Sequence, residues 1–170
     1  MKLLTALAAA LVLNFGAINS MDAAAQQEKG NNIMATEDFA TVFARGEKND
    51  AYAQYFVGQS YLNILSLEQV VIGNVTFEPG CRNNWHIHKA AKGGGQILLV
   101  TGGRGYYQEW GKEPRELHPG DVVNIPTGVK HWHGAAPDSW FAHLAIEVPG
   151  EETSNEWCEP VNDEEYNKLK

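Results

Sequence analysis

The chain has 170 residues, a formal net charge of −8 at pH 7, 44% hydrophobic residues and 10% aromatic residues. This length and composition fit one globular domain. The excess of acidic residues argues against a nucleic-acid-binding protein, which would need a basic face. Two cysteines are too few for a disulfide scaffold or an all-cysteine zinc site.

The first 25 residues have the pattern of a signal peptide. Lys2 gives a short positive start, an apolar run covers residues 3–13, and Ala23-Ala24-Ala25 offers a cleavage site. The apolar run is too short for a stable transmembrane helix, and no later segment is long and apolar enough to be one. We therefore expect export to a periplasm or beyond, with no membrane span.

Beyond residue 25, the chain is expected to form an all-β domain between two extensions. Residues 26–50 are polar and are predicted to form a linker, with a short helix near residues 36–44. Over residues 51–150, short apolar runs alternate with glycine and proline turns, which is typical of a β-sandwich or barrel. The expected strands cover residues 61–67, 70–77, 85–88, 96–101, 105–110, 122–125, 129–133 and 140–148.

The last twenty residues carry much of the negative charge. Residues 151–170 hold seven acidic and two basic residues, so their net charge is −5. We interpret them as a solvated acidic tail rather than a docking segment. A short helix is expected over residues 162–169, with Asn162 or Asp163 at its N-cap.

Histidines mark the expected functional site. His86 and His88 are two residues apart on a predicted strand, so both side chains point to one face of the sheet. Two imidazoles on one face can each supply a nitrogen to the same divalent metal ion. His131 and His133 share a face of a later strand in the same way, and His143 lies on the last predicted strand. His133 and His143 could do acid–base work near neutral pH in a shared pocket. The alternative for each is a histidine that is tied structurally to a neighbouring backbone carbonyl.

Two motifs have a spacing that can be compared with a known family. The first runs from Gly80 through five residues to His86-Ile87-His88, then to Gln96 and through six residues to Gly103. The second runs from Gly120 through five residues to Pro126-Thr127-Gly128 and through two residues to His131. Over roughly residues 70–148 the sequence thus resembles the cupin superfamily. The resemblance implies a double-stranded β-helix, or jelly-roll barrel, and the helices predicted above would form short helical N- and C-terminal extensions of it.

The same resemblance implies a metal site. Its ligands would be His86, His88, Gln96 and His131, with Gln96 in place of the acidic ligand of the family after a longer, glycine-rich gap. This ligand set is neutral and suits Mn, Fe, Ni, Co or Zn. The alternative for Gln96 is a polar residue that is hydrogen-bonded inside the barrel without contacting a metal.

A closer resemblance concerns residues 120–123, 131–137 and 143–146. They look like small bacterial cupins that include manganese-dependent hydroxynitrile lyases, and like cupins associated with carboxymuconolactone-decarboxylase-like domains. This similarity implies manganese, a small-molecule substrate and further catalytic positions at Asn83, His133 and His143. Glu147 would occupy one more pocket position, where a carboxylate can change the substrate.

The expected chemistry is C–C lyase chemistry. The metal would act as a Lewis acid, and His143 or His133 would take a hydroxyl proton. The same site could serve a metal-dependent dioxygenase, or a cupin that binds a small molecule without catalysis. A structural barrel without metal is a further alternative, because this fold hosts many functions.

Three further expectations concern the rest of the chain. A homodimer is expected because cupins commonly pair, and the apolar face of Trp85 and Ile87 is compatible with pairing. Cys81 and Cys158 could form a disulfide that pins the tail, or remain two unpaired thiols, and Cys81 could be a fifth metal ligand. His118 is expected in a surface loop.

Overall fold

The computed structural model describes residues 39 and 41–169. The expected signal peptide and the linker up to residue 38 lie outside the described residues. Within the described part of the chain, no helix is long and apolar enough to cross a membrane.

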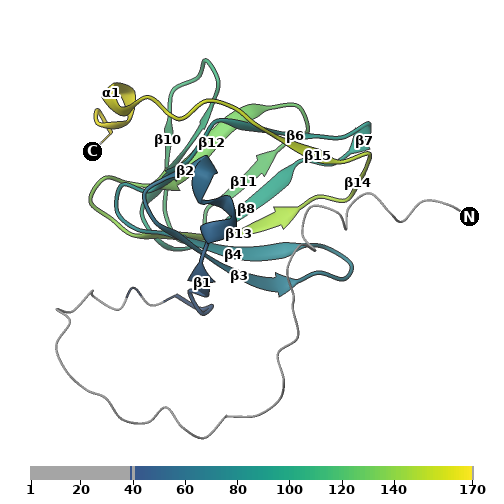
Figure 1. The fold of residues 1–170 in the computed structure, drawn as a ribbon, viewed down its shortest axis with the longest axis horizontal. Coiled ribbons are helices and arrows are strands. Elements are labelled where there is room, and N and C mark those ends of the chain that lie inside the picture. The colour runs from purple at the N-terminus through teal and green to yellow at the C-terminus, as the bar shows by residue number, and fades with distance from the viewer. Residues whose placement is uncertain (1–38, 40, 170) are drawn as a thin grey trace, which may run out of the picture. The chain divides into compact units, whose positions relative to one another are not determined.

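Antiparallel strands dominate the structure, with two short helical segments (Figure 1). The strands are β1 (Glu47–Lys48), β2 (Phe56–Val57), β3 (Ser60–Ser66), β4 (Ile72–Phe77), β5 (Arg82–Asn83), β6 (His86–Lys89), β7 (Lys92–Gly93), β8 (Gln96–Gly103), β9 (Gly105–Glu109), β10 (Arg115–Leu117), β11 (Val122–Ile125), β12 (Lys130–Ala135), β13 (Phe141–Glu147), β14 (Gly150–Glu151) and β15 (Ser154–Trp157). The helical segments are the 3-10 helix η1 (Asp50–Tyr55) and the α-helix α1 (Asp163–Tyr166).

Two sheets form the body of this domain. The first has the strand order β1-β3-β4-β13-β8-β11. The second has the order β10-β9-β12-β5-β2, and β6 joins it by pairing with both β12 and β15. A small third sheet pairs β14 with β7. The predicted all-β barrel with short helical segments is confirmed.

The inner faces of the two sheets enclose a hydrophobic core. Phe77, Leu98, Val123 and Phe141 belong to this cluster and are almost fully buried. Side chains alternate along a strand, so a polar residue two positions from an inward-facing apolar residue also points into the barrel. His143 on β13, two residues after Phe141, is fully buried in this way.

A second hydrophobic cluster covers the outer face of the second sheet. Trp85 and Trp132 pack there against Val161 and Tyr166 of the C-terminal segment. Asn162 accepts hydrogen bonds from the backbone N–H groups of the first turn of α1, so the predicted helix and its Asn162 cap are confirmed. The apolar Trp85 face is therefore covered by the chain itself.

The N-terminal helix forms later in the chain than the sequence predicted. Among the described residues of the range 36–44, the backbone bends at residues 42 and 43 and forms no helix. Phe39 stacks on Trp140 with ring centroids 5.7 Å apart, and Arg45 lies over the same indole. These contacts hold the segment along the first sheet, and the helix begins only at Asp50.

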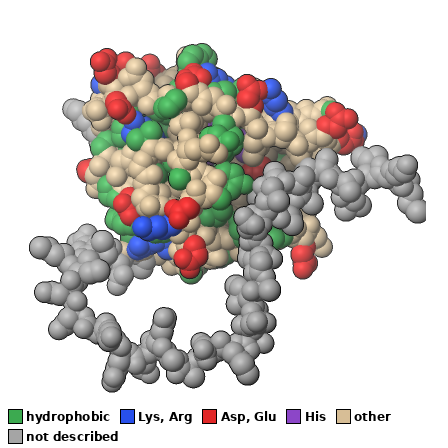
Figure 2. Space-filling model, in the orientation of Figure 1, with side chains coloured by type: hydrophobic (Ala, Val, Ile, Leu, Met, Phe, Trp, Pro, Cys, Tyr) green, Lys and Arg blue, Asp and Glu red, His purple; other side chains and the backbone are tan. Residues whose placement is uncertain are grey.

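The acidic C-terminal segment is only partly a solvated tail. Its backbone supplies β15, which lies beside β6 and pairs with it (Figure 1). In this ladder Trp157 is opposite His86. Glu151, Glu152 and Glu156 are exposed, and acidic side chains are scattered over the face shown in Figure 2. The charges therefore face solvent, while the backbone that carries them completes the sheet.

The two cysteines are unpaired, so the disulfide that would pin the tail does not form. Cys81 lies in the inner core, where burial raises the pKa of its thiol to about 12. Cys158 packs against the outer cluster. The two thiols thus belong to clusters on opposite faces of the second sheet, which explains why they do not meet.

Candidate metal centre

The three histidines predicted as metal ligands lie together in the barrel, and Glu147 connects the fourth predicted ligand, Gln96, to His88. His86 and His131 are opposite each other in the β6–β12 ladder, and their ring centroids are 4.1 Å apart. The ring of His88 lies 5.2 Å from that of His86 and 5.5 Å from that of His131. Gln96 begins β8, and all four side chains are buried.

Backbone carbonyls orient two of these imidazoles. His86 Nδ1 lies 2.9 Å from the carbonyl oxygen of Asn84, and His131 Nδ1 lies 2.9 Å from that of Val129. A carbonyl can only accept, so Nδ1 carries the proton in both rings. Each Nε2 then presents its lone pair, which is the usual arrangement in histidines that bind a metal.

Several acceptor atoms here are buried without a hydrogen-bond partner among the described residues. They are His88 Nε2, Gln96 Oε1 and His131 Nε2. Leaving a buried polar atom unsatisfied costs about 1–3 kcal/mol, so three such atoms in one place need an explanation. Nitrogen and oxygen lone pairs are the donors that a divalent transition metal takes, and this donor set therefore fits a metal ion.

One further histidine joins the cluster. His86, His131 and His133 each offer a ligand atom, and these atoms lie within 4.8 Å of one another. This three-histidine cluster suits a divalent metal. From the sequence, His133 is expected to be an acid–base group rather than a ligand. Its position in the barrel makes it the acid–base candidate nearest to the ligands.

Asn83, His133 and His143 form a buried hydrogen-bonded group. Asn83 Oδ1 accepts the backbone N–H of His133 at 3.0 Å, and Asn83 Nδ2 lies 3.1–3.2 Å from the ring nitrogens of His133. His143 Nε2 lies 3.1 Å from His133 Nδ1. Burial lowers the pKa of His133 well below 6.5 and that of His143 to about 4. Both rings are therefore neutral at pH 7.

Glu147 ends β13 and contacts two of the predicted metal ligands. Its Oε1 accepts a hydrogen bond of 2.7 Å from Gln96 Nε2, and its Oε2 lies 3.2 Å from His88 Nδ1. The second contact is an ion-pair distance at which the ring N–H is not aligned for a hydrogen bond. The side chain of Glu147 is 34% exposed, whereas that of His88 is 5% exposed. Burial and the Glu147 charge both raise the pKa of the neighbouring Tyr52.

Comparison with known proteins agrees with this geometry. A family model described as "Cupin domain" matches residues 73–145. A protein named (R)-mandelonitrile lyase from Granulicella tundricola is 47% identical over 95 residues, which cover 56% of this chain and 70% of that protein. The chain belongs to the cupin family. A cupin-like protein from Thermotoga maritima, known from its crystal structure, is 40% identical to this cupin. The match covers 75% of this chain and 96% of that one, with a TM-score of 0.65.

Two aromatic residues of this cupin's site were missed from the sequence. Trp157 on β15 lies against His86 with ring centroids 4.9 Å apart, and Tyr55 of η1 stacks on the other side of Trp157 at 4.5 Å. Both residues lie outside the family match at residues 73–145. A large aromatic residue inside an acidic segment was the available signal, because such side chains rarely stay in solvent.

Two residues that the sequence analysis considered lie away from the site. The side chain of His118 is 59% exposed and pairs with Glu116, so the predicted surface position is confirmed. Cys81 packs in the hydrophobic core and is not among the residues whose donor atoms cluster.

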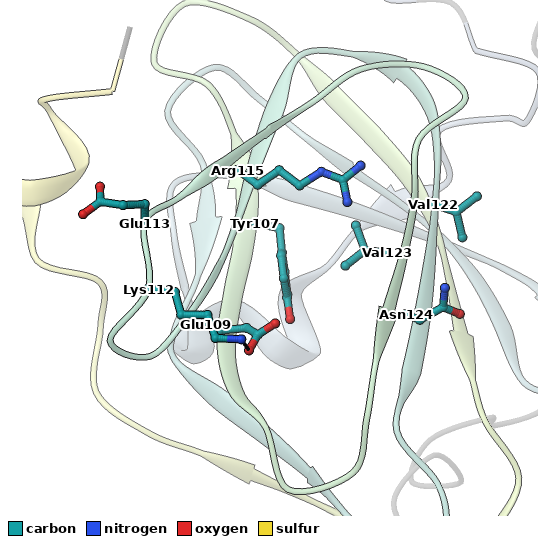
Figure 3. A pocket seen from close by; sticks show the side chains of 8 residues that line it. All are labelled: Tyr107, Glu109, Lys112, Glu113, Arg115, Val122, Val123 and Asn124. Atoms are coloured by element: carbon teal, nitrogen blue, oxygen red, sulfur yellow. Dashed lines mark ion pairs between the residues drawn. The ribbon is translucent and has the colours of Figure 1, made fainter.

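Figure 3 shows the residues that line a pocket of about 420 Å³. It lies between β9, the β9–β10 turn and β11, and Tyr107 points into it in Figure 3. The ring centroid of Tyr107 is 5.7 Å from that of His131. Tyr107 therefore lines the pocket and also lies next to one histidine of the cluster.

Proposed function

We propose that this cupin is a metal-dependent enzyme that cleaves a C–C bond in a small organic molecule, with chemistry of the hydroxynitrile-lyase type. One observation carries the proposal. Buried metal-ligating atoms of His88, Gln96 and His131 have no hydrogen-bond partner among the described residues, and the ring of His131 lies 5.9 Å from His133 in a neutral, hydrogen-bonded pair of imidazoles. The identity of 47% with a mandelonitrile lyase supports the choice of reaction.

The residues proposed to hold the metal are His86, His88, Gln96 and His131. Manganese is the metal we propose, since the sequence resembles manganese-dependent lyases and a nitrogen and oxygen donor set accepts Mn²⁺. A divalent ion bound there would supply Lewis-acid polarisation of a substrate oxygen.

We assign the transfer of the substrate's hydroxyl proton to the pair of His133 and His143. His133 lies closer to the proposed ligands, with its ring centroid 5.4 Å from that of His86, while His143 lies behind it. In cyanohydrin cleavage His133 takes the hydroxyl proton, the O–H electron pair forms the carbonyl, and the C–C bond breaks. Cyanide leaves with the C–C electron pair and takes the proton as hydrogen cyanide. His143 and Asn83 hold the ring of His133 while it exchanges this proton.

The test combines metal analysis with turnover. Stoichiometric manganese or another divalent transition metal is expected in the purified protein, together with release of benzaldehyde from mandelonitrile. Purified protein that neither contains nor binds such a metal would overturn the proposal. Consumption of O₂ with enol or diol substrates, without mandelonitrile turnover, would instead identify a dioxygenase. A ligand that raises the melting temperature and is never consumed would identify a binding protein.

Export and a homodimer belong to the same proposal. The N-terminal pattern motivates export, and N-terminal sequencing of the secreted protein tests it. Light scattering tests pairing. Since Trp85 is covered by the C-terminal segment, we propose that two copies would meet on another surface.

A further inference from the structure

We propose that Glu147 is a positioning residue, which turns both His88 and Gln96 so that their lone pairs face the metal. The inference rests on the proposed metal site and adds to it. One carboxylate would then orient two ligands, each of which would otherwise need a hydrogen-bond acceptor of its own.

The backbone places Glu147 for this role. In the β13–β8 ladder Glu147 is directly opposite Gln96, so their side chains lie on the same face of the sheet. The backbone N–H of Glu147 donates to the carbonyl of Val71 at 3.0 Å, which fixes the end of β13. The carboxylate therefore starts from a fixed point beside the barrel interior.

Glu147 determines which end of the Gln96 amide faces inward. A glutamine amide has a donor end and an acceptor end, and the two differ little in shape. The carboxylate only accepts, so it takes the donor end, Nε2, at 2.7 Å. The acceptor end, Oε1, is then turned away into the buried site, where no described residue satisfies it. Without Glu147 the N–H donors could face a cation, which would repel it.

Glu147 also places an oxygen beside Nδ1 of His88, which has no hydrogen-bond partner among the described residues. Nδ1 of His86 and Nδ1 of His131 each lie 2.9 Å from a backbone carbonyl. The corresponding contact of His88 Nδ1 is with Glu147 Oε2 at 3.2 Å. A carboxylate at this distance favours the tautomer with the proton on Nδ1 and the lone pair on Nε2. In this tautomer Nδ1 of each of the three histidines faces an oxygen, which accepts a hydrogen bond from His86 and His131 and lies at ion-pair distance from His88.

The charge of Glu147 has a second consequence. Gln96 stands where the related motif has an acidic ligand, so the four proposed ligands carry no charge. Glu147 contacts two of these ligands, Gln96 and His88. Its carboxylate therefore places one negative charge behind the ligands, where it would not touch the metal itself. Because opposite charges attract across a poorly solvated site, this carboxylate strengthens the binding of a divalent cation.

The experiment compares Glu147→Gln with Glu156→Gln. Glu156 lies on the neighbouring strand β15 and pairs with the exposed Lys89, so it controls for the loss of a nearby carboxylate. Metal affinity is measured by competition between each protein and a chelator, for Mn²⁺ and Zn²⁺. Glu147→Gln is expected to weaken binding about 10- to 100-fold, as substitutions behind metal-binding histidines do. Glu156→Gln is expected to bind as the wild type does, and Glu147→Asp is expected to weaken binding because it is shorter by one methylene.

A second measurement needs neither metal nor turnover. Nitrogen-15 NMR of metal-free protein with labelled histidines reports the tautomer of each ring, and the spectrum of His88→Gln identifies the His88 signals. We expect a proton on Nδ1 of His88 in the wild type and in Glu156→Gln, and a mixture of tautomers in Glu147→Gln. An unchanged His88 tautomer together with unchanged metal affinity in Glu147→Gln would overturn the inference.

The outcomes separate this inference from the proposed function. If wild-type protein binds no metal, the proposed function fails, whereas the tautomer measurement still decides whether Glu147 orients His88. If Glu147→Gln loses turnover but keeps both its metal affinity and the His88 tautomer, Glu147 contacts the substrate and the positioning role is wrong. Circular dichroism and thermal melting of each variant verify that it is folded.

Discussion

His143 Nε2 lies 3.1 Å from His133 Nδ1, and both rings are buried within the barrel. One of the two nitrogens must donate and the other accept, because both rings are neutral. The pair can therefore pass a proton between two strands, β12 and β13, that belong to different sheets. The first prediction concerns this contact.

Removing either histidine of this pair is expected to slow turnover. His133→Ala should reduce kcat for mandelonitrile by about 10²- to 10⁴-fold, the usual contribution of a positioned acid–base group. His143→Ala should cost less, since it acts through His133. Steady-state kinetics on metal-loaded protein checks both values. The exposed His118→Ala variant is the control and should match the wild type.

The free energy of unfolding is expected to depend on pH through His143. Its pKa is about 4 in the folded protein because burial disfavours the charged ring, and about 6.5 when unfolded. The unfolded state therefore binds more protons between pH 4 and 6.5. The contribution of His143 to the free energy of unfolding is therefore fully present above pH 6.5 and is lost as the pH falls toward 4. The loss is about 3 kcal/mol for this residue.

Urea titrations with a chelator present test the pH dependence. The loss of unfolding free energy from pH 6.5 to 4 should be smaller in His143→Gln than in the wild type. Equal slopes in the two proteins would show that His143 does not carry the effect.

Removing the metal is expected to destabilise the protein. Any ion that binds the folded state alone stabilises it by mass action, about 2.7 kcal/mol when its concentration is 100 times Kd. Chelation should therefore lower the Tm of the wild type, and added Mn²⁺ should restore it. In His86→Ala the Tm should no longer respond to either treatment. A wild-type Tm that is indifferent to chelator and metal would contradict the proposed site.

The aromatic contact behind His86 should contribute to stability. Trp157 stacks between Tyr55 and His86, so Trp157→Ala is expected to lower the free energy of unfolding by about 2 kcal/mol. Trp110 is 58% exposed, and Trp110→Ala should change the stability much less. Chemical denaturation of the two variants provides the comparison. A similar loss in both would mean that Trp157 packs no better than a surface tryptophan.

Much of the barrel could be predicted because its strands are separated by glycine and proline turns. β11 spans Val122–Ile125, as expected, and β13 differs from its predicted range by one residue at each end. The inward face of His131 and His133 also followed from strand alternation. β15 was not predicted, because its sequence Ser-Asn-Glu-Trp has no alternating pattern and only its pairing with β6 makes it a strand.

Residues of the candidate site could be named from the sequence, but the contacts that orient them could not. Strand alternation and motif spacing pointed to His86, His88 and His131, which do lie together. The carbonyls of Asn84 and Val129 that orient two of these rings leave no trace in residue type, since every residue has a carbonyl. The contact of Glu147 with two ligands depends on the register of β13 against β8, which the sequence does not state.

β15 pairs with β6, which carries two of the proposed ligands, and it lies outside the family match at residues 73–145. A fragment cut at the limits of that match would leave the backbone of β6 unpaired along this side. Unpaired strand edges recruit strands from other molecules. Such a fragment is therefore expected to aggregate or to exchange strands, and the unit that folds in this cupin is longer than the unit recognised by its motifs.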